Sequence, residues 1–410
     1  MNKTKTILQT LSVFESRNIL FIDPDGSWPI VWERAKGVHV WDVEGRKYLD
    51  LTAAFGVASA GHANPRVVAA GRKQVGKLLH AMGDVHPHGP KALLARELSR
   101  LTFERWTKNF TGKTIFANSG FEAVEAALKT AILATGKREV IAFKGAYHGL
   151  GYGALNATHR EHFRGPFASQ LSEFGCFAPF PTTTKELAET AKVIRKLFRT
   201  HKVGAILVEP IQARGGINVP PTGFLPLLRK LCDEHKALLI FDEIYTGFGR
   251  TGKWFACEHS KTVPDLICLG KAMAGGFPIS ACVGRADIMN QAWPVSMGEA
   301  IHTSTFLGHP VGCAMALAQI QEITRLKLVE RSAQLGKALL KMLPGARGVG
   351  LMVGVEVADG GFQITKEMLR RGFIILPEGE QGNVVSFTPP LTITKAQLAV
   401  AAKALRECLP

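Results

Sequence analysis

Two charged residues that end apolar runs in the middle of the chain point to cofactor chemistry. Asp242 follows the apolar run 238–241, and Lys271 follows the run 266–270, which places the lysine 271 − 242 = 29 residues after the acid. An apolar setting lowers the pKa of a lysine amine and makes it a better nucleophile. An acid next to a heterocyclic nitrogen keeps that nitrogen protonated. A Schiff-base lysine and a pyridinium partner are what pyridoxal phosphate requires, although the spacing alone fits a simple buried ion pair equally well.

Two glycine motifs near these residues do not fit nucleotide binding. The segment GFGRTG at 247–252 matches G-x-G-x-x-G, but residues 243–246 separate it from the strand before it, and TGKWFACEHS is a poor helix start. Lys271 follows a glycine, but Asp265 stands where a phosphate-binding loop needs its first glycine, and Ala272 where it needs Ser or Thr. We therefore expect neither a dinucleotide site nor a phosphate-binding loop of this kind.

The segments around these residues alternate between short apolar runs and amphipathic stretches. Short Val/Ile/Leu runs between helices are typical of a mostly parallel sheet that helices cover on both faces. The chain is thus predicted to have an α/β fold. The predicted strands are 113–120, 139–145, 203–210, 238–244, 265–271 and 278–284, and the predicted helices are 121–136, 185–202 and 227–237.

Polar residues gather where the predicted strands end. Asn118, the segment 145–149, Glu209, Asp242 and Lys271 all lie at the carboxyl ends of these runs. In sheets of this kind ligands bind beyond the carboxyl ends of the strands. These residues are therefore expected to meet at one edge of the sheet.

The two ends of the chain have a different character. Residues 38–51 have the pattern of a hairpin with Glu44 and Gly45 in its turn, and residues 309–343 form one long helical stretch. The rest of the C-terminal part is expected to hold short strands and a final helix, as in a smaller α+β domain. The predicted short strands are 350–357, 372–379 and 383–390.

Composition narrows the class of protein. The chain has 410 residues, 46% of them hydrophobic, and a net charge of +16, but the basic residues are scattered, so we do not expect a nucleic-acid partner. His86 and His88 flank a proline with no third ligand evident, so no metal is expected. No apolar run is long enough to span a membrane, and the N-terminus lacks a signal-peptide core. Seven cysteines without a C-x-x-C pair indicate free thiols and a cytoplasmic protein.

The chain resembles the class III pyridoxal-phosphate aminotransferases, the group of the ornithine, acetylornithine and 4-aminobutyrate enzymes. The resemblance covers about residues 37–390 and is most specific in VEPIQARGGINVPPTGFLPLLRKLCDEHKALLIFDEIYTGFGRTGKWFACEH, followed by PDLICLGKAMAGGFPISACVG. It implies pyridoxal 5'-phosphate as cofactor and a fold-type-I enzyme. Such an enzyme has a large domain with a mostly parallel seven-stranded sheet, a smaller α+β domain, and a homodimer with shared active sites. The corresponding division is 1–60 as an N-terminal segment that joins the small domain, 61–309 as the cofactor domain, and 310–410 as the small domain.

The resemblance also implies roles for individual residues. Lys271 is similar to the Schiff-base lysine that carries protons, and Asp242 to the partner of the pyridine nitrogen. Ile244 and Tyr147 correspond to the residues on the two faces of the cofactor ring, and Thr305 to the threonine that reaches the phosphate of the neighbouring subunit. The other positions implied to bind the cofactor are Ser119, Gly120 and Phe121 at a helix N-terminus, which suits a phosphate, together with His148, Glu209 and Tyr245.

Several positions depart from the family pattern, and two of these departures change charge. Ser386 stands just before F-x-P-P, where members that act on α-amino acids usually have arginine, and Arg214 stands where ornithine- and 4-aminobutyrate-type members have the glutamate that neutralises that arginine. Either Arg214 binds the substrate carboxylate from the other side, or the substrate has no carboxylate next to its amine. Phe55 and Val57 are expected to complete the substrate pocket.

These features predict an aminotransferase that moves an amino group from an amine or amino acid to an oxo acceptor, with an ω-amine or 4-aminobutyrate-like donor favoured. A decarboxylase or aminomutase on the same scaffold is the alternative. Two alternatives from other functional classes are an NAD-dependent dehydrogenase and a basic nucleic-acid-binding protein.

Overall fold

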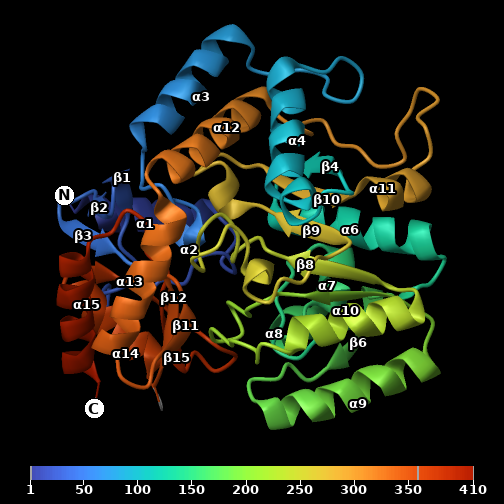
Figure 1. Cartoon of the computed structure of the whole chain (residues 1–410). Coiled ribbons are helices and arrows are strands. Elements are labelled where there is room, and N and C mark those ends of the chain that lie inside the picture. Colours follow the sequence, from blue (N-terminus) through green and yellow to red (C-terminus); the bar gives the residue numbers. More distant parts are fainter. Residues whose placement is uncertain (1, 358–359, 410) are drawn as a thin grey trace.

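A seven-stranded sheet forms the centre of the chain. The computed structural model describes residues 2–357 and 360–409. The strand order is β4-β10-β9-β8-β7-β5-β6, and every pairing is parallel except those of β10, which runs antiparallel to β4 and β9. The predicted α/β class and the mostly parallel seven-stranded sheet are therefore confirmed (Figure 1). The strands are β4 (Gly112–Ala117), β5 (Glu139–Phe143), β6 (Gly175–Ala178), β7 (Val203–Val208), β8 (Leu238–Asp242), β9 (Leu266–Leu269) and β10 (Ser280–Arg285).

Helices cover both faces of this sheet, which explains why its strands are apolar without interruption. In β8, Leu239 and Phe241 belong to one buried cluster and Ile240 to another, because successive side chains point to opposite faces. One face packs against α6, and the other packs against α10. The main helices of this part are α4 (Gly89–Leu101), α6 (Gly120–Thr135), α9 (Thr184–Thr200), α10 (Phe224–His235) and α11 (Ala286–Ala292).

The edge strand β6 was not predicted from the sequence. It is only four residues long, and three of them are partly exposed, so it lacks the continuous apolar run that marks its neighbours. A Cβ at Gly175 would lie 1.9 Å from the carbonyl oxygen of Asn156. This strand position therefore requires a glycine, a residue that is otherwise unfavourable in strands.

The N-terminal hairpin and the C-terminal elements form two further four-stranded sheets. The hairpin predicted at 38–51 is confirmed, and its second strand also pairs in parallel with β13 from near the C-terminus. The blue N-terminal strands and the orange and red C-terminal elements consequently lie together in Figure 1. The sheet orders are β1-β2-β3-β13 and β11-β12-β15-β14, with β1 (Trp32–Lys36), β2 (His39–Asp42), β3 (Lys47–Asp50), β11 (Arg347–Val349), β12 (Met352–Glu356), β13 (Phe373–Ile374), β14 (Leu376–Glu378) and β15 (Val384–Phe387).

The long helical stretch predicted at 309–343 is two helices. The break falls at Lys327, whose φ of 49° is left-handed and cannot continue an α-helix. The first of the two packs against α3 and α4, and the second packs against α15. The helices are α3 (Pro65–Lys77), α12 (Pro310–Arg325), α13 (Leu328–Met342), α14 (Gly361–Arg370) and α15 (Lys395–Cys408).

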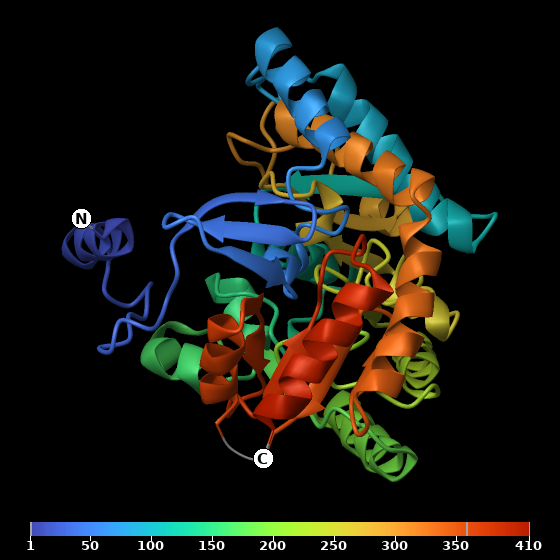
Figure 2. The same cartoon turned by 90° about the vertical axis from the view of Figure 1, so that its left-hand side faces the viewer.

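The N-terminal helix α1 (Lys3–Phe14) projects from one side of the molecule (Figure 2) and has no buried residue. The backbone N–H of Thr4 donates to Glu44 in the turn of the hairpin at 3.0 Å. Within the residues that the structure describes, no helix is both long and apolar enough to cross a membrane. The remaining short helices are α2 (Ala53–Gly56), α5 (Phe103–Trp106), α7 (Tyr152–Ala157), α8 (Glu161–Arg164), η1 (Gly165–Gln170), η2 (Ala256–His259) and η3 (Lys271–Met273).

The glycine motif at 247–252 has a structural function. Its Arg250 is fully buried and donates hydrogen bonds to the carbonyls of Leu351 at 3.0 Å and Pro389 at 2.6 Å. The segment thus joins the central part of the chain to the C-terminal part.

His88 begins helix α4, with its Nδ1 accepting the N–H of Lys91 at 3.2 Å.

Candidate active site

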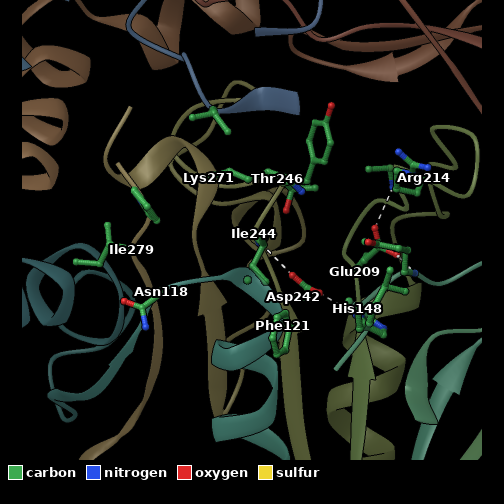
Figure 3. A pocket seen from close by; sticks show the side chains of 18 of the residues that line it. Asn118, Phe121, His148, Glu209, Arg214, Asp242, Ile244, Thr246, Lys271 and Ile279 are labelled. Atoms are coloured by element: carbon green, nitrogen blue, oxygen red, sulfur yellow. Dashed lines mark hydrogen bonds and ion pairs between the residues drawn. The ribbon is translucent and has the colours of Figure 1, made fainter. Parts of the chain in front are cut away.

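A cavity of about 550 Å³ opens at the carboxyl ends of the central strands. Asn118 follows β4, Glu209 follows β7, and Lys271 follows β9, so parallel strands bring distant residues to one edge. Figure 3 shows these side chains around a common space. The cavity is lined by Val57, Asn118, Gly120, Phe121, Tyr147, His148, Gly149, Leu150, Glu209, Ala213, Arg214, Asp242, Ile244, Tyr245, Thr246, Lys271, Gly276, Phe277, Pro278 and Ile279.

Lys271 is a half-buried amine at this cavity. Burial of the amine lowers its pKa, while the charges of Asp242, Glu209 and Glu378 work in the opposite direction. Its Nζ lies 4.2 Å from the centre of the Tyr245 ring, over the ring face. A lysine amine with a lowered pKa has a larger uncharged fraction near neutral pH, which is the form that attacks a carbonyl carbon.

Asp242 is held in place from two sides, as Figure 3 shows. Its Oδ1 accepts the backbone N–H of Ile244 at 3.1 Å, and its Oδ2 lies 2.8 Å from Nδ1 of His148. Both side chains are buried. Nε2 of His148 has no hydrogen-bond partner among the described residues. This pair fixes the direction of the carboxylate while the acid remains at the cavity wall.

Glu209 connects two loops at the same edge. Its Oε1 accepts the N–H of Tyr147 at 3.0 Å, and its Oε2 accepts the N–H of Ala213 at 3.1 Å. Burial raises the pKa of this carboxyl to about 7, and the nearby Asp242 charge adds to that effect, whereas His148 opposes it. A carboxyl with this pKa exchanges its proton near neutral pH.

The N-terminus of α6 reaches the cavity beside Ile244. Glu122 accepts the backbone N–H groups of Ser119 at 2.6 Å and Asn118 at 3.1 Å. The N–H groups of Gly120 and Phe121, in the first turn, have no acceptor within the helix. A Cβ at Gly120 would approach Ile244 to 3.1 Å, so the absence of a side chain keeps this approach to the helix N-terminus open.

These groups fit pyridoxal phosphate. The set contains a lysine amine with a lowered pKa, a fixed carboxylate, and an anion-compatible helix N-terminus. Tyr147 and Ile244 are lining residues with flat or apolar surface. Phe121 supplies only its backbone N–H for an anion, because its side chain has no hydroxyl.

The structure brings most of the predicted site residues to this cavity but leaves three of them outside its lining. Ser119 is adjacent to the lining, where its hydroxyl donates to Glu122 at 2.8 Å. Phe55 is 50% exposed and lies two residues before the lining residue Val57. Thr305 is exposed in the segment between α11 and α12. The predicted residues that line the cavity are Val57, Gly120, Phe121, Tyr147, His148, Glu209, Arg214, Asp242, Ile244, Tyr245 and Lys271.

Tyr245 does not point its hydroxyl freely into the cavity. Its Oη lies 3.2 Å from Oγ1 of Thr388, and burial raises the pKa of the phenol to about 12. A Cβ at Gly56, where φ is +81°, would lie 3.0 Å from the Tyr245 ring. The Tyr245 ring is thus packed between Gly56 and Lys271, and its hydroxyl is not a free hydrogen-bond donor.

Sequence reasoning missed two charged residues near the cavity. Glu378 ends β14 and lies 3.5 Å from Arg214, and the charge of Arg160 influences the pKa of both Tyr147 and Glu378. Neither residue belongs to a motif, and both come from segments that the fold brings to the sheet edge. The lining residues 276–279 were also missed, although 278 and 279 begin a predicted strand.

The chain is similar to known proteins over almost its full length. The family described as Aminotransferase class-III matches residues 22–409. A 5-aminovalerate aminotransferase of Pseudomonas aeruginosa is 37% identical over 93% of this chain and 93% of its own length. An acetylornithine aminotransferase of Methanosarcina mazei is 37% identical over 94% of this chain and 93% of its own. The solved structure of an amine transaminase from an uncultivated Pseudomonas species, in a form bound to pyridoxal phosphate, has a TM-score of 0.88 and 26% identity, covering 97% of this chain and 98% of the other.

Proposed function

This chain belongs to the class-III aminotransferase family, and from this premise we propose that it moves the amino group of an ω-amine or ω-amino acid to an oxo acid. It is a pyridoxal-phosphate-dependent aminotransferase. The observation that carries the proposal is the meeting of Lys271, Asp242 and the N-terminus of α6 at one cavity. The relatives named above are aminotransferases, and the decarboxylase alternative has no support among them.

Lys271 is the proposed proton carrier. When bound, pyridoxal phosphate supplies an electron sink for the charge that develops on the substrate carbon. Lys271 would hold the cofactor through its amine before substrate arrives. Its Nζ, once free, would take the proton from the substrate carbon and deliver it to the cofactor, and the acceptor half-reaction would reverse this transfer. The lowered pKa of Lys271 supports this role because a mostly protonated amine is a poor base.

Asp242 is the proposed partner of the pyridine nitrogen. Nδ1 of His148 lies 2.8 Å from Oδ2 of Asp242 and fixes the carboxylate orientation. Glu209 holds the Tyr147 backbone, so the Tyr147 ring would stack on one face of the cofactor ring and Ile244 would pack on the other. Tyr245 packs beside Lys271, whose Nζ lies 4.2 Å from the ring centre.

The cofactor phosphate is assigned to the N-terminus of α6. The N–H groups of Gly120 and Phe121 and the partial positive charge of the helix end favour an anion there. Ser119 precedes the first residue of α6, and its contribution is to hold the turn at this helix N-terminus. Thr305 is proposed to contact the phosphate of the neighbouring subunit, because in its own chain it lies outside the cavity lining.

Arg214 is proposed to bind a carboxylate of the substrate. Its guanidinium lines the cavity and lies 5.6 Å from the Tyr147 ring centre. An arginine pairs with a carboxylate through two parallel hydrogen bonds. Ser386 is buried and donates to the Leu376 carbonyl at 3.3 Å, so a carboxylate has no cation at that position. Val57, and Phe55 near the opening, would contact the apolar part of the substrate.

We also propose a homodimer with shared active sites. Two neighbouring segments, 78–86 and 294–309, expose a group of apolar side chains, and the ring of His80 contacts Phe306 between them. Apolar surface of this extent marks an interface, and a second copy of this chain is the occupant that places Thr305 near a cofactor. The exposed side chains are Leu78, Leu79, Met82, Val85, Val295, Met297, Ile301 and Phe306.

The domain division and the cellular location complete the proposal. We propose that residues 1–60 join the small domain 310–410 and that 61–309 bind the cofactor; the β3–β13 pairing supports the first part. Helix α12, which packs against α3, links the two parts. The cysteines of the described chain are all free thiols, which supports a reducing, cytoplasmic setting.

A donor panel on the purified holoenzyme tests the proposed function. A diamine, 4-aminobutyrate, an aromatic amine and an α-amino acid are each added while the cofactor absorbance is followed. We expect the ω-amines to convert the cofactor to its amine form and an oxo acid to restore it. Conversion by the α-amino acid alone would contradict the ω-specificity, and release of carbon dioxide without any acceptor would contradict transfer.

A further inference from the structure

A buried carboxylate lies next to the arginine that lines the cavity. Glu378 is the last residue of β14, and only 2% of its side chain is exposed, whereas 31% of the Arg214 side chain is exposed. The Gly379 N–H donates to the Arg214 carbonyl at 3.0 Å, which ties the two segments together. Arg214 lines the cavity, whereas Glu378 does not.

The contact between these two residues is loose. Nε of Arg214 and Oε2 of Glu378 are 3.5 Å apart, and neither atom has a hydrogen-bond partner among the described residues. Strong arginine–carboxylate pairs have shorter, paired hydrogen bonds. Burial raises the pKa of Glu378 to about 7, although Arg214, Lys271 and Arg160 favour its charged form. Because this pair lacks short hydrogen bonds, Glu378 binds Arg214 only weakly.

The neighbouring strand β15 supplies no charged side chain at 386 that could pair with Arg214. Leu376 of β14 pairs with Ser386 of β15, and Glu378 pairs with Val384. The side chain at 386 is neutral and hydrogen-bonded to the backbone. Arg214 therefore has Glu378 as its ion-pair partner in the described part of the chain, and any carboxylate in the cavity must compete with that acid.

We propose that Glu378 is a built-in competitor for Arg214 that sets the balance between substrates with and without a carboxylate. With a carboxylate-free amine in the cavity, Glu378 neutralises Arg214. With an amino acid or oxo acid in the cavity, the substrate carboxylate binds the exposed side of the Arg214 guanidinium. This binding weakens the contact between Arg214 and Glu378. The inference rests on the proposed role of Arg214 as the carboxylate-binding residue.

The test compares glutarate binding to the holoenzyme by titration calorimetry in four proteins. Glutarate is an unreactive dicarboxylate, so the readout does not depend on turnover. In Glu378→Gln the competing charge is lost and the shape is kept, and we expect glutarate to bind about tenfold more tightly, the order expected for one charge-assisted contact. Glu380→Gln, an exposed position two residues on, serves as the matched control and should bind like the wild type.

Arg214→Ala separates the two levels of the proposal. If Arg214→Ala weakens glutarate binding but Glu378→Gln leaves it unchanged or weaker, Glu378 is not a competitor while the role of Arg214 stands. If Arg214→Ala has no effect, the proposed carboxylate site itself is wrong and the inference falls with it.

Kinetics give a second readout. In Glu378→Gln the KM for 4-aminobutyrate and for the oxo acid should fall, the KM for an aromatic amine should not fall, and kcat should change little for each. Equal changes for all substrates would overturn the proposal. If Glu378→Gln does not fold, Glu378→Asp, which withdraws the charge by one methylene, should tighten glutarate binding to a smaller degree, and unchanged binding would count against the proposal.

Discussion

At the scale of single residues, the site depends on groups that are held by neighbours rather than by solvent. Asp242 is fixed by the Ile244 N–H and by His148, and Glu209 is fixed by two backbone N–H groups. A group that is already oriented needs no reorganisation when charge develops near it, which is the main source of electrostatic catalysis. The proposed chemistry of Lys271 therefore depends on residues that follow other strands of the same sheet.

Replacing Asp242 with asparagine tests this dependence. Asparagine keeps the size of the side chain but removes the charge that would keep the pyridine nitrogen protonated. We expect kcat/KM in Asp242→Asn to fall by about 10²–10³-fold, the usual effect of losing one preorganised electrostatic contact. Asp233→Asn, at an exposed position on α10, should match the wild type. An Asp242→Asn enzyme with more than a tenth of wild-type activity would contradict the assigned role.

At the scale of elements, the end of β8 carries a second acid with a purely structural environment. Glu243 is fully buried and accepts the N–H groups of Ala256 at 2.9 Å and Cys257 at 2.8 Å, as well as the Thr246 hydroxyl. Burial raises the pKa of its carboxyl to about 7. One strand end thus supplies both the acid at the cavity and the acid that holds the following loop.

This pKa predicts how stability changes with pH. Because the folded chain binds the Glu243 proton more tightly than the unfolded chain, the stabilisation from this group is fully present below pH 4.5 and is lost as the pH rises through 7. The difference, 7 − 4.5, corresponds to roughly 3 to 4 kcal/mol at about 1.4 kcal/mol per pH unit.

The measurement is the unfolding midpoint of the wild type and of Glu243→Gln between pH 5 and pH 8. Glu209 and Glu378 also have pKa values of about 7, so the difference between the two proteins isolates Glu243. We expect the midpoint of Glu243→Gln to fall less over this range, whatever its absolute value. Parallel curves would show that Glu243 does not titrate there.

The elements of the sheet could be predicted from the sequence where burial on both faces leaves a continuous apolar run, as in β7 and β8. Strand β6 could not, because an exposed edge strand lacks that run. The break at Lys327 was also missed, since a lysine gives no local signal of left-handed backbone. At the site, strand ends identified Asp242 and Lys271, whereas Glu378 comes from another sheet, and only tertiary structure brings it to Arg214.

At the scale of the whole molecule, the exposed segments 78–86 and 294–309 are proposed to form a dimer interface that would complete the active site. The Thr303 hydroxyl donates to Asp84 at 2.5 Å and holds the two segments together. This contact keeps the neighbouring Thr305 on a defined surface rather than on a free loop. A site completed by a partner chain has a specific consequence for mixtures of defective subunits.

Subunit complementation measures that consequence. Lys271→Ala and Thr305→Glu enzymes should each be nearly inactive, the second because a carboxylate repels the phosphate. A heterodimer of the two, purified through different tags, has one site with both an intact Lys271 and an intact Thr305. We expect it to recover about half of the wild-type activity per dimer. A heterodimer no more active than its parents would contradict the contribution of Thr305 across the interface.

The most direct test of the whole account is to reduce the holoenzyme with borohydride and to map the modified peptide by mass spectrometry. The account predicts a yellow protein whose colour is lost on reduction and whose cofactor becomes permanently attached to Lys271, with no attachment in Lys271→Ala. Attachment at another lysine, or none in a protein saturated with pyridoxal phosphate, would contradict it.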